Sequence, residues 1–384
     1  MQDGLIKSVR DLLLSGMRSV RRRFAPKAIS LYAPRASEAD RRELAARISF
    51  YFGDAVRVRV QRGRLPTWLL FDGPLLLFCP PGAPRPLLSS RALGVFDVNF
   101  HTSPIEAWAW FDAEVYLNGA PDRSAARASY QAWKSRVAAL HLDKAYAFGT
   151  GPSLAAASDR PWSDGIRIVC NTIVRDPELW RHIAPHAIVA ADALYHFGPT
   201  EFARAFRADL LLRLRESPQV VFIYPDIFHS VVVRDLPIEP HRLIPIRKGA
   251  SQTVHTCLAD DFTLPGLGNV LNLMLLPVGC NLSKQVKLWG FDGRAPGDAL
   301  FWANSSKHSY PELMETLQAA HPAFFDHFVP KDDPEAYVRA VHGDVLEYCL
   351  SQAEKDGWTF EMLHRSWTPT LERRRRAEGA GTAG

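Results

Sequence analysis

Two side chains in this sequence could transfer a proton or attack an electrophile. His308 lies in a polar stretch, residues 304–310, and a histidine can take a proton from a hydroxyl group or hold a phosphate as a cation. Asp192 follows the apolar run 188–191, and a carboxylate at a strand end can act as base, nucleophile or hydroxyl-binding group. The simpler alternatives are a surface histidine in a loop and an aspartate that caps a helix or a turn.

A glycine-containing turn is the candidate binding site. The apolar run 145–148 leads into Gly149-Thr150-Gly151-Pro152-Ser153, and a second apolar run, 166–170, ends at Asn171. Glycines let the backbone approach a ligand, and the N–H groups that open the next helix can hold an anion. The Asn171 amide both donates and accepts, so it can read a ribose, a base edge or a phosphate. The alternatives are a tight turn without a ligand and an asparagine that satisfies its own turn.

Other kinds of site are not supported by the sequence. The turn lacks the third glycine of a dinucleotide fingerprint and the lysine of a P-loop. His182 and His186 are separated by Pro185, which breaks a helix, so a zinc pair is not expected. The five cysteines show no CxxC spacing, which argues against a zinc site or a disulfide framework and fits a reducing cytoplasm. We therefore expect no resident metal or cofactor.

The elements that would position these residues follow a strand, loop and helix order, which is typical of a parallel sheet. We predict an α/β fold with a Rossmann-like, mostly parallel sheet of five strands, at residues 145–148, 166–170, 187–191, 219–224 and 285–289. Their carboxyl ends carry Gly149, Asn171, Asp192, Asp226, and Gly290 with Asp292. Polar residues and glycines at successive strand ends are what a ligand cleft at one edge of an open sheet needs.

The length of 384 residues favours more than one domain. From the N-terminus we predict a basic amphipathic helix, a small α/β domain, the Rossmann-like domain, C-terminal helices and a disordered basic tail, at 1–25, 26–140, 141–330, 331–370 and 371–384. In the small domain we expect a helix capped by Ser37 with Asp40, and a hairpin at Asp72-Gly73. His101 could face a substrate there, or only make a backbone hydrogen bond.

The net charge of +5 is concentrated at the two ends of the chain. Residues 1–23 hold six basic and two acidic side chains, and residues 371–384 hold four and two, so the remainder is 5 − 4 − 2 = −1. This distribution argues against a broad nucleic-acid surface. It fits chain ends that lie against the anionic inner face of the cytoplasmic membrane. Solvated ends without a partner are the alternative. No apolar run has the length of a membrane span.

Further motifs accompany the glycine turn in a fixed order. Gly266-Leu267-Gly268-Asn269 opens an apolar helix, a strand ends at Gly290-Phe291-Asp292, and Lys307-His308-Ser309 follows. With G-T-G-P-S-L and the strand ending in Cys170-Asn171, this order resembles bacterial sialyltransferases that use a CMP-activated sugar. The first motif is also similar to one in retaining Kdo transferases and in the MptE-like pterin diphosphokinase fold. The match covers residues 144–325, less than half of the chain.

The resemblance implies roles for individual residues. His308 would assist displacement of CMP, and Asp192 would serve as base or nucleophile. The nucleotide would be bound by Gly149, Thr150, Gly151, Pro152, Ser153, Asn171, Thr172, Gly268, Asn269, Gly290, Phe291 and Asp292. The chain departs from the sialyltransferase pattern at the tyrosine pair near the leaving phosphate, where it has Phe301-Trp302. Tyr310 and Tyr195 are the candidates to replace that pair.

The resemblance leads to a prediction of function. We expect a glycosyltransferase that moves an acidic sugar of the Kdo or sialic-acid type from a CMP-sugar donor to a glycan or glycolipid acceptor at the cell surface. One alternative is a pterin diphosphokinase that uses ATP and magnesium, with Asp192, Asp226 and Asp292 converging on the metal. The other is a non-catalytic scaffold with a transferase fold.

Overall fold

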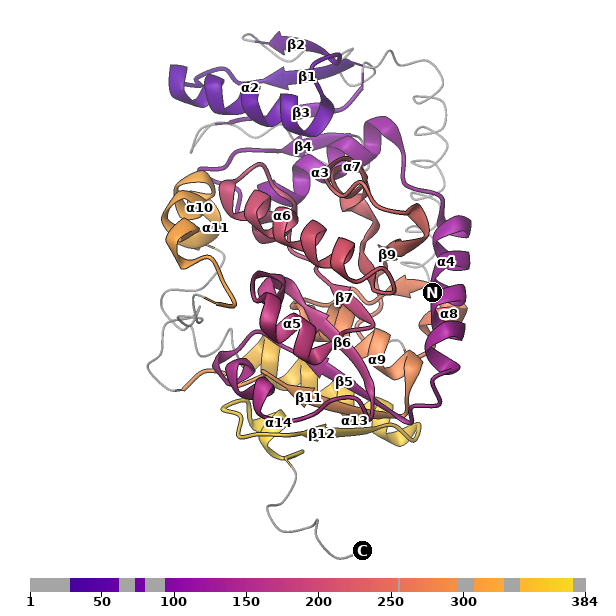
Figure 1. Cartoon of the computed structure of the whole chain (residues 1–384). Helices are drawn as coiled ribbons and strands as arrows, with labels where there is room; N and C mark the ends of the chain where they lie inside the picture. Colours follow the sequence, from indigo (N-terminus) through magenta and orange to yellow (C-terminus); the bar gives the residue numbers. More distant parts are fainter. Residues whose placement is uncertain are drawn as a thin grey trace, which may run out of the picture. The chain divides into compact units, whose positions relative to one another are not determined.

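The computed structural model describes residues 28–61, 73–79, 94–254, 256–295, 307–327 and 339–375. The predicted N-terminal helix lies outside these residues. The chain divides into two compact units, each described separately below (Figure 1). Unit 1 comprises Met1–Ala120 and Gln318–Val329, and unit 2 comprises Pro121–Leu317 and Pro330–Gly384. These two units group the chain differently from the predicted domains at 26–140 and 141–330, because each unit is built from two separate stretches of chain.

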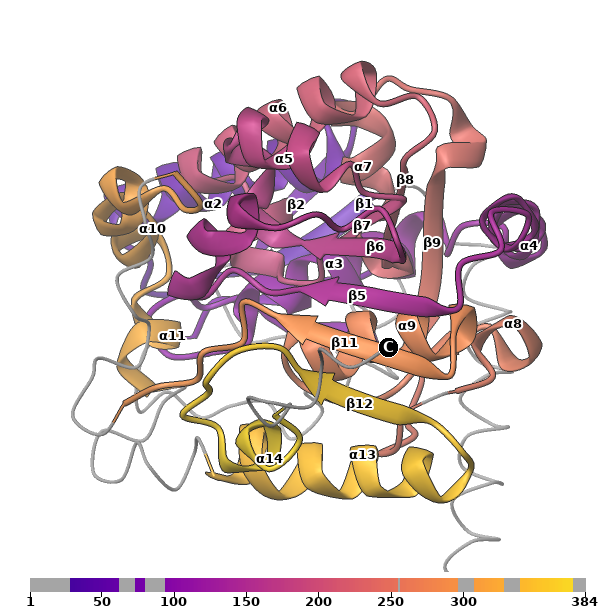
Figure 2. The ribbon, with the colours of Figure 1, turned by 60° about the horizontal axis from the view of Figure 1, so that its bottom comes forward.

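Unit 2 is built on an eight-stranded sheet in which every pair of neighbours is parallel. The strand order is β10-β9-β8-β7-β6-β5-β11-β12, and Figure 2 shows the run from β7 to β12 side by side. The strands are β5 (Lys144–Phe148), β6 (Ile166–Cys170), β7 (Ala187–Val189), β8 (Val221–Pro225), β9 (Leu243–Lys248), β10 (Thr263–Leu264), β11 (Gln285–Trp289) and β12 (Thr359–Met362). The predicted Rossmann-like α/β class is confirmed, with three strands more than expected.

Helices cover both faces of this sheet, which explains why its strands are continuous apolar runs rather than alternating ones. One core cluster joins inward side chains such as Ile168 and Val221 to α4, α9 and α13. Residues of the opposite register, such as Phe148 and Phe222, pack on Trp162 and Phe197. The helices are α4 (Arg123–Ala138), α5 (Pro177–Ile183), α6 (Glu201–Glu216), α7 (His229–Asp235), α8 (Leu258–Asp261), α9 (Leu276–Leu282), α10 (Met314–Ala320), α13 (Val345–Lys355) and α14 (Pro369–Glu372). No helix among the described residues is long and apolar enough to cross a bilayer.

Unit 1 holds a smaller parallel sheet of order β2-β1-β3-β4. It consists of β1 (Ala28–Tyr32), β2 (Arg57–Gln61), β3 (Leu75–Leu77) and β4 (Val95–Asp97), with α2 (Glu38–Phe52), α3 (Glu106–Asn118) and α11 (Pro322–His327). The predicted capping box is present, since Asp40 N–H donates to Ser37 and the Asp40 carboxylate accepts from Ser37 N–H. β3 pairs in parallel with β1 on one side and with β4 on the other. The predicted hairpin at Asp72-Gly73 is therefore wrong, because β3 has no free edge for an antiparallel partner.

A buried ionic network ties the second stretch of unit 1 to the first. The Arg47 guanidinium lies 2.9 Å from the Glu106 carboxylate and donates to the carbonyl of Ala320 at 2.5 Å. His321 pairs with the other carboxylate oxygen of Glu106. All three charged or titratable side chains are almost inaccessible to water. Such a network is stable only when every member is present, because a buried charge without its partner costs about 3–5 kcal/mol.

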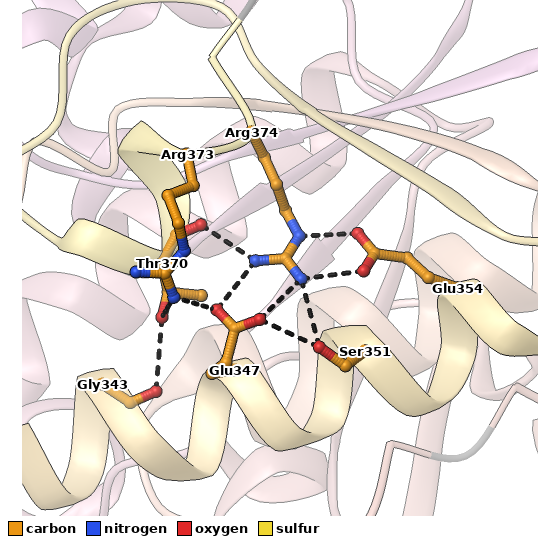
Figure 3. Close-up of polar contacts among 7 residues, drawn as sticks. All are labelled: Gly343, Glu347, Ser351, Glu354, Thr370, Arg373 and Arg374. Atoms are coloured by element: carbon orange, nitrogen blue, oxygen red, sulfur yellow. Dashed lines mark hydrogen bonds and ion pairs between the residues drawn. The ribbon is translucent and has the colours of Figure 1, made fainter.

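The predicted disordered tail begins with a folded segment. Arg374 bonds Glu347 and Glu354 of α13 through four contacts of 2.6–3.0 Å, and Arg373 adds a contact to Glu347 (Figure 3). These contacts hold α14 on α13, so the prediction of disorder is wrong for residues 371–375. Residues 376–384 lie outside the described part of the chain.

Replacing Arg374 by Ala is expected to lower the free energy of unfolding of unit 2 by about 1.5–3 kcal/mol, because it removes charged hydrogen bonds at a nearly buried side chain. Arg375→Ala is the matched control, since its pair with Glu372 is exposed and worth less than about 1 kcal/mol. Urea unfolding midpoints measure both. Equal effects of the two substitutions would refute the claim that the contacts of Arg374 stabilise unit 2.

The contacts of Arg374 with Glu347 and Glu354 also make the stability of unit 2 depend on pH in a defined direction. Hydrogen bonds from Arg374 hold the pKa of Glu347 far below its ordinary value. Because the folded pKa is the lower one, the contribution is complete above the unfolded pKa of about 4.3 and is lost as the pH falls below it. The destabilisation by Arg374→Ala should therefore shrink in acid.

Candidate functional site

The predicted strand ends meet at one edge of the unit 2 sheet. β11, β5, β6, β7 and β8 are adjacent and parallel, so Gly290, Gly149, Asn171, Asp192 and Asp226 follow one another along its carboxyl edge. The strand order reverses between β5 and β11, since the chain runs outward from β5 to β10 and then returns to the other side of β5. Ligands of open α/β sheets bind outside the carboxyl ends of the strands at such a switch point.

The two glycine loops clasp each other at this switch point. Gly149 N–H donates to the Trp289 carbonyl at 2.7 Å, and Gly151 N–H donates to the Gly290 carbonyl at 2.9 Å. A Cβ on Gly151 would lie 2.2 Å from Asp292 Oδ2, and one on Gly290 would lie 2.2 Å from the Gly149 carbonyl oxygen. Gly290 also has a φ of +80°, which favours glycine. The glycines are thus required for the contact between the loops.

Asp292 occupies the position in which an anion was expected. Its carboxylate accepts hydrogen bonds from Ser153 N–H at 3.1 Å and from the Ser153 hydroxyl at 2.9 Å. Ser153 lies in the first turn of the 3₁₀ helix Pro152–Asp159. A carboxylate of the protein therefore satisfies the helix N-terminus, and a bound phosphate would need other donors.

A histidine that the sequence analysis missed completes this corner. His364 follows β12, and its Nε2 accepts Gly290 N–H at 2.9 Å and lies 2.8 Å from Ser153 Oγ. This segment lies in the range 331–370, which was predicted to hold C-terminal helices. The structure corrects this prediction, because Thr359–Met362 pairs in parallel with β11. The only sequence signal is the alternation of Phe360 and Met362, which bury their side chains.

Asn171 presents an unsatisfied acceptor at the end of β6. Its φ is +52°, a left-handed conformation that asparagine tolerates better than most residues. Its amide oxygen is buried and has no hydrogen-bond partner among the described residues. A buried amide oxygen without a partner costs about 1–3 kcal/mol. Such an atom is a position that a ligand donor would satisfy.

The next residues hold His308 against the same strand end. Thr172 Oγ1 donates to the His308 carbonyl, and His308 Nε2 lies 3.1 Å from Asp176 Oδ2. Arg175 donates to the carbonyl of Ser309. His308 is only 2% exposed, so it is not the surface histidine of the simpler alternative. Tyr310 uses its hydroxyl on Asp209 at 2.6 Å, which engages one of the two tyrosines considered for the leaving phosphate.

The Asp176–His308 pair has the arrangement of an oriented base. Burial lowers the pKa of His308 below its ordinary value, although Asp176 acts in the opposite direction. The imidazole is therefore neutral at pH 7, with Nε2–H directed to Asp176. Among the described residues Nδ1 has no hydrogen-bond partner, so its lone pair can take a proton. Asp176 is itself fixed, because its other oxygen caps α5 through Glu178 N–H and Leu179 N–H. A neutral ring favours proton transfer over the cationic phosphate contact.

The three carboxylates of the diphosphokinase alternative, Asp192, Asp226 and Asp292, do not form one group. Asp192 Oδ1 caps the π-helical turn Ala193–Phe197 through Leu194 N–H and Tyr195 N–H, which is the capping alternative. Asp192 and Asp292 follow strands that are three steps apart, or about 14 Å. Among the described residues, no three His, Cys, Asp or Glu side chains are grouped so that they could hold a metal ion.

Three further predicted positions have structural partners. Asn269 accepts Asn272 N–H at 2.9 Å and so caps the helical segment that leads into α9, next to Gly268. Phe291 packs against the main core cluster.

In unit 1, His101 Nε2 lies 2.9 Å from Asp40, and its backbone N–H donates to Asn99. His182 and His186 bond Arg160 and Arg167 and do not form a pair.

Replacing Gly151 by Ala is expected to lower the free energy of unfolding by about 1–3 kcal/mol, because the added methyl group overlaps Asp292 and the Gly290 carbonyl. Gly343→Ala is the control, since nothing in the described chain lies within 4 Å of its Cβ position, and alanine favours helix there. Chemical unfolding of both variants tests this. A Gly151→Ala protein as stable as Gly343→Ala would refute the tight loop contact.

The fold and this edge define a Rossmann-like α/β protein with a candidate ligand site at the switch point of its sheet. Comparisons with protein-family models, curated proteins and solved structures found no match to this chain. The function therefore has to be argued from the geometry of the site itself and from the order of its motifs.

Proposed function

We propose that the protein is a glycosyltransferase that uses a CMP-activated acidic sugar of the Kdo or sialic-acid type. The observation that carries the proposal is the buried, unsatisfied oxygen of Asn171 beside the Thr172–His308 contact. It supplies a position for a nucleotide donor group next to an oriented base. The motif order supports the nature of the donor, because it resembles that of CMP-sugar transferases.

The nucleotide contacts follow from which groups are already engaged. Gly149 and Gly151 use their N–H groups within the protein, and Ser153 uses its N–H on Asp292. These loop residues therefore shape the edge of the site. Asn171 offers the hydrogen-bond acceptor, which suits an amino group of cytosine or a ribose hydroxyl.

The chemical step assigns the proton to His308. An acceptor hydroxyl attacks the anomeric carbon of the donor, the bond from that carbon to the CMP phosphate breaks, and CMP leaves with the bond electrons. The hydroxyl proton passes to Nδ1 of the neutral imidazole, which Asp176 orients through Nε2. Because the ring is 2% exposed, the acceptor reaches it only after the side chain or its loop moves.

The acceptor in this proposal is a surface glycan or glycolipid, and the basic chain ends would keep the enzyme at the inner face of the membrane. The pterin diphosphokinase alternative is less well supported, because its three carboxylates are not grouped. A scaffold without turnover would leave the Asp176–His308 pair without a role.

Thermal stability against CMP, CDP, UDP, GDP and ATP with magnesium tests the proposal. A ligand at a hundred times its dissociation constant adds about 2.7 kcal/mol to the folded state. We expect the protein to be stabilised by CMP or CDP and by none of the other nucleotides. An activity assay should then show release of CMP from CMP-Kdo or CMP-sialic acid. Stabilisation by ATP with magnesium alone would favour the diphosphokinase, and no shift with any nucleotide would favour the scaffold.

A further inference from the structure

The segment 364–367, which follows β12, is bound to the loop that follows β11 at the switch point. Three hydrogen bonds join three of its residues to three successive residues of that loop. They run from Gly290 N–H to His364 Nε2 at 2.9 Å, from the Ser366 hydroxyl to the Phe291 carbonyl at 2.7 Å, and from Trp367 N–H to the Asp292 carbonyl at 2.6 Å. The backbone of this segment is therefore fixed at the edge of the sheet where the candidate ligand site lies.

Two side chains of this segment take no part in these contacts. Trp367 is 48% exposed, and it is the only exposed tryptophan that the structure describes. The Arg365 guanidinium lies over its ring, 4.5 Å from the centroid. Neither the indole N–H nor the guanidinium has a hydrogen-bond partner within the described ranges of the chain. Two planar groups are thus held next to the switch point by their backbone and remain accessible to a ligand.

The carboxylates near Arg365 are engaged elsewhere. Glu372 is close enough to attract the guanidinium, but it accepts Ser366 N–H at 2.8 Å and pairs with Arg375 at 2.7 Å. The Asp292 carboxylate is used by the helix that follows β5. Within the described part of the chain, the positive charge of Arg365 is therefore not neutralised by a bonded carboxylate.

The chemistry and the position of this pair both suit a nucleobase. An indole ring and a guanidinium plane are surfaces on which bases stack. The loop after β11 lies two strand spacings, or about 10 Å, from Asn171 at the end of β6. An extended nucleotide whose ribose bonds Asn171 covers this distance with its base. Its phosphate then lies toward His308, which Thr172 holds beside the same strand end.

We propose that Arg365 and Trp367 form the stacking platform for the base of the nucleotide donor. This inference rests on the proposed function and narrows it, because Asn171 then bonds the ribose and not the amino group of cytosine. The platform contacts neither the ribose nor the phosphate. Its contribution is therefore confined to ligands that carry a base.

Calorimetric titration of the full-length protein with CMP, and with ribose 5-phosphate as the ligand without a base, tests the platform. Trp367→Ala is expected to weaken CMP binding about 10–100-fold and to leave ribose 5-phosphate binding unchanged. Trp367→Phe should keep most of the CMP affinity, because it retains an aromatic ring. Tyr348→Ala is the matched control, since Tyr348 lies on α13, is 52% exposed and should not affect either ligand. The melting temperatures should not change, because both side chains are exposed.

The outcomes separate this inference from the proposed function. If CMP binds wild type, Trp367→Ala and Tyr348→Ala equally, or if Trp367→Ala weakens ribose 5-phosphate as much as CMP, the platform fails and the proposed function stands. If CMP does not bind, but UDP, GDP or ATP with magnesium binds and Trp367→Ala weakens it, the platform stands and CMP-dependent transfer fails. If no nucleotide binds the wild-type protein, both are overturned.

Discussion

Replacing His308 by Gln is expected to lower the rate of sugar transfer by about 10²–10⁴-fold, with little change in CMP affinity. Glutamine can keep the contact with Asp176 but cannot take the proton of the acceptor hydroxyl. His182→Gln is the matched control, because it lies on α5 and, within the described part of the chain, its ring bonds only the Arg160 carbonyl. The measurement is CMP release from the donor in the presence of acceptor.

The dependence of kcat/KM on pH gives a second test of His308 as the base. Asp176 raises the pKa of His308, so Asp176→Asn should move the acid limb of kcat/KM to lower pH while lowering the plateau. The amide can still cap α5 through its oxygen. A His308→Gln enzyme with the wild-type rate, or an acid limb that moves to higher pH in Asp176→Asn, would refute the assignment of the base.

Asn171→Gly is expected to weaken CMP binding about 10–100-fold without lowering the stability of the protein. Glycine adopts a φ of +52° freely, and the substitution removes a buried oxygen that has no partner among the described residues. A structural asparagine would behave in the opposite way, since its loss would lower the melting temperature and leave affinity unchanged. Calorimetric titration with CMP and thermal unfolding separate the two cases.

Ala184→Gly is the control for backbone freedom, because Ala184 has a φ of +48° and lies before β7 at the other edge of the sheet. It introduces the same residue in the same conformation away from the site. Unchanged CMP affinity in Asn171→Gly, or an equal loss in Ala184→Gly, would remove Asn171 from the nucleotide site.

Local patterns were sufficient to predict the strands that matter most for the site. The bounds of β6 and β11 match the predicted runs, because continuous apolar residues between turn residues indicate a buried parallel strand without reference to the rest of the chain. The placement of Gly149, Asn171 and Gly290 at one edge then followed from the parallel order. The capping box of α2 is predictable for the same reason, since it involves residues three apart.

The partners of these residues were not predictable, because they are distant in sequence. Asp176 orients a histidine 132 positions further on, and His364 bonds an amide 74 positions before it. β12 has only four residues and becomes a strand through its pairing with β11. The role of Asp292 was also missed, since no local pattern shows that a carboxylate after β11 caps a helix after β5.

The discontinuity of unit 1 has a consequence for biosynthesis. Arg47 and Glu106 leave the ribosome early, but Ala320 and His321 emerge only after β5 to β11 have been translated. While the sheet of unit 2 is being synthesised, the first stretch of unit 1 therefore lacks the Ala320 and His321 partners of its buried network. A nascent chain in which residues 320 and 321 are still inside the ribosome should hold unit 1 in a protease-sensitive state. A longer chain, in which residues up to 329 have emerged, should protect it.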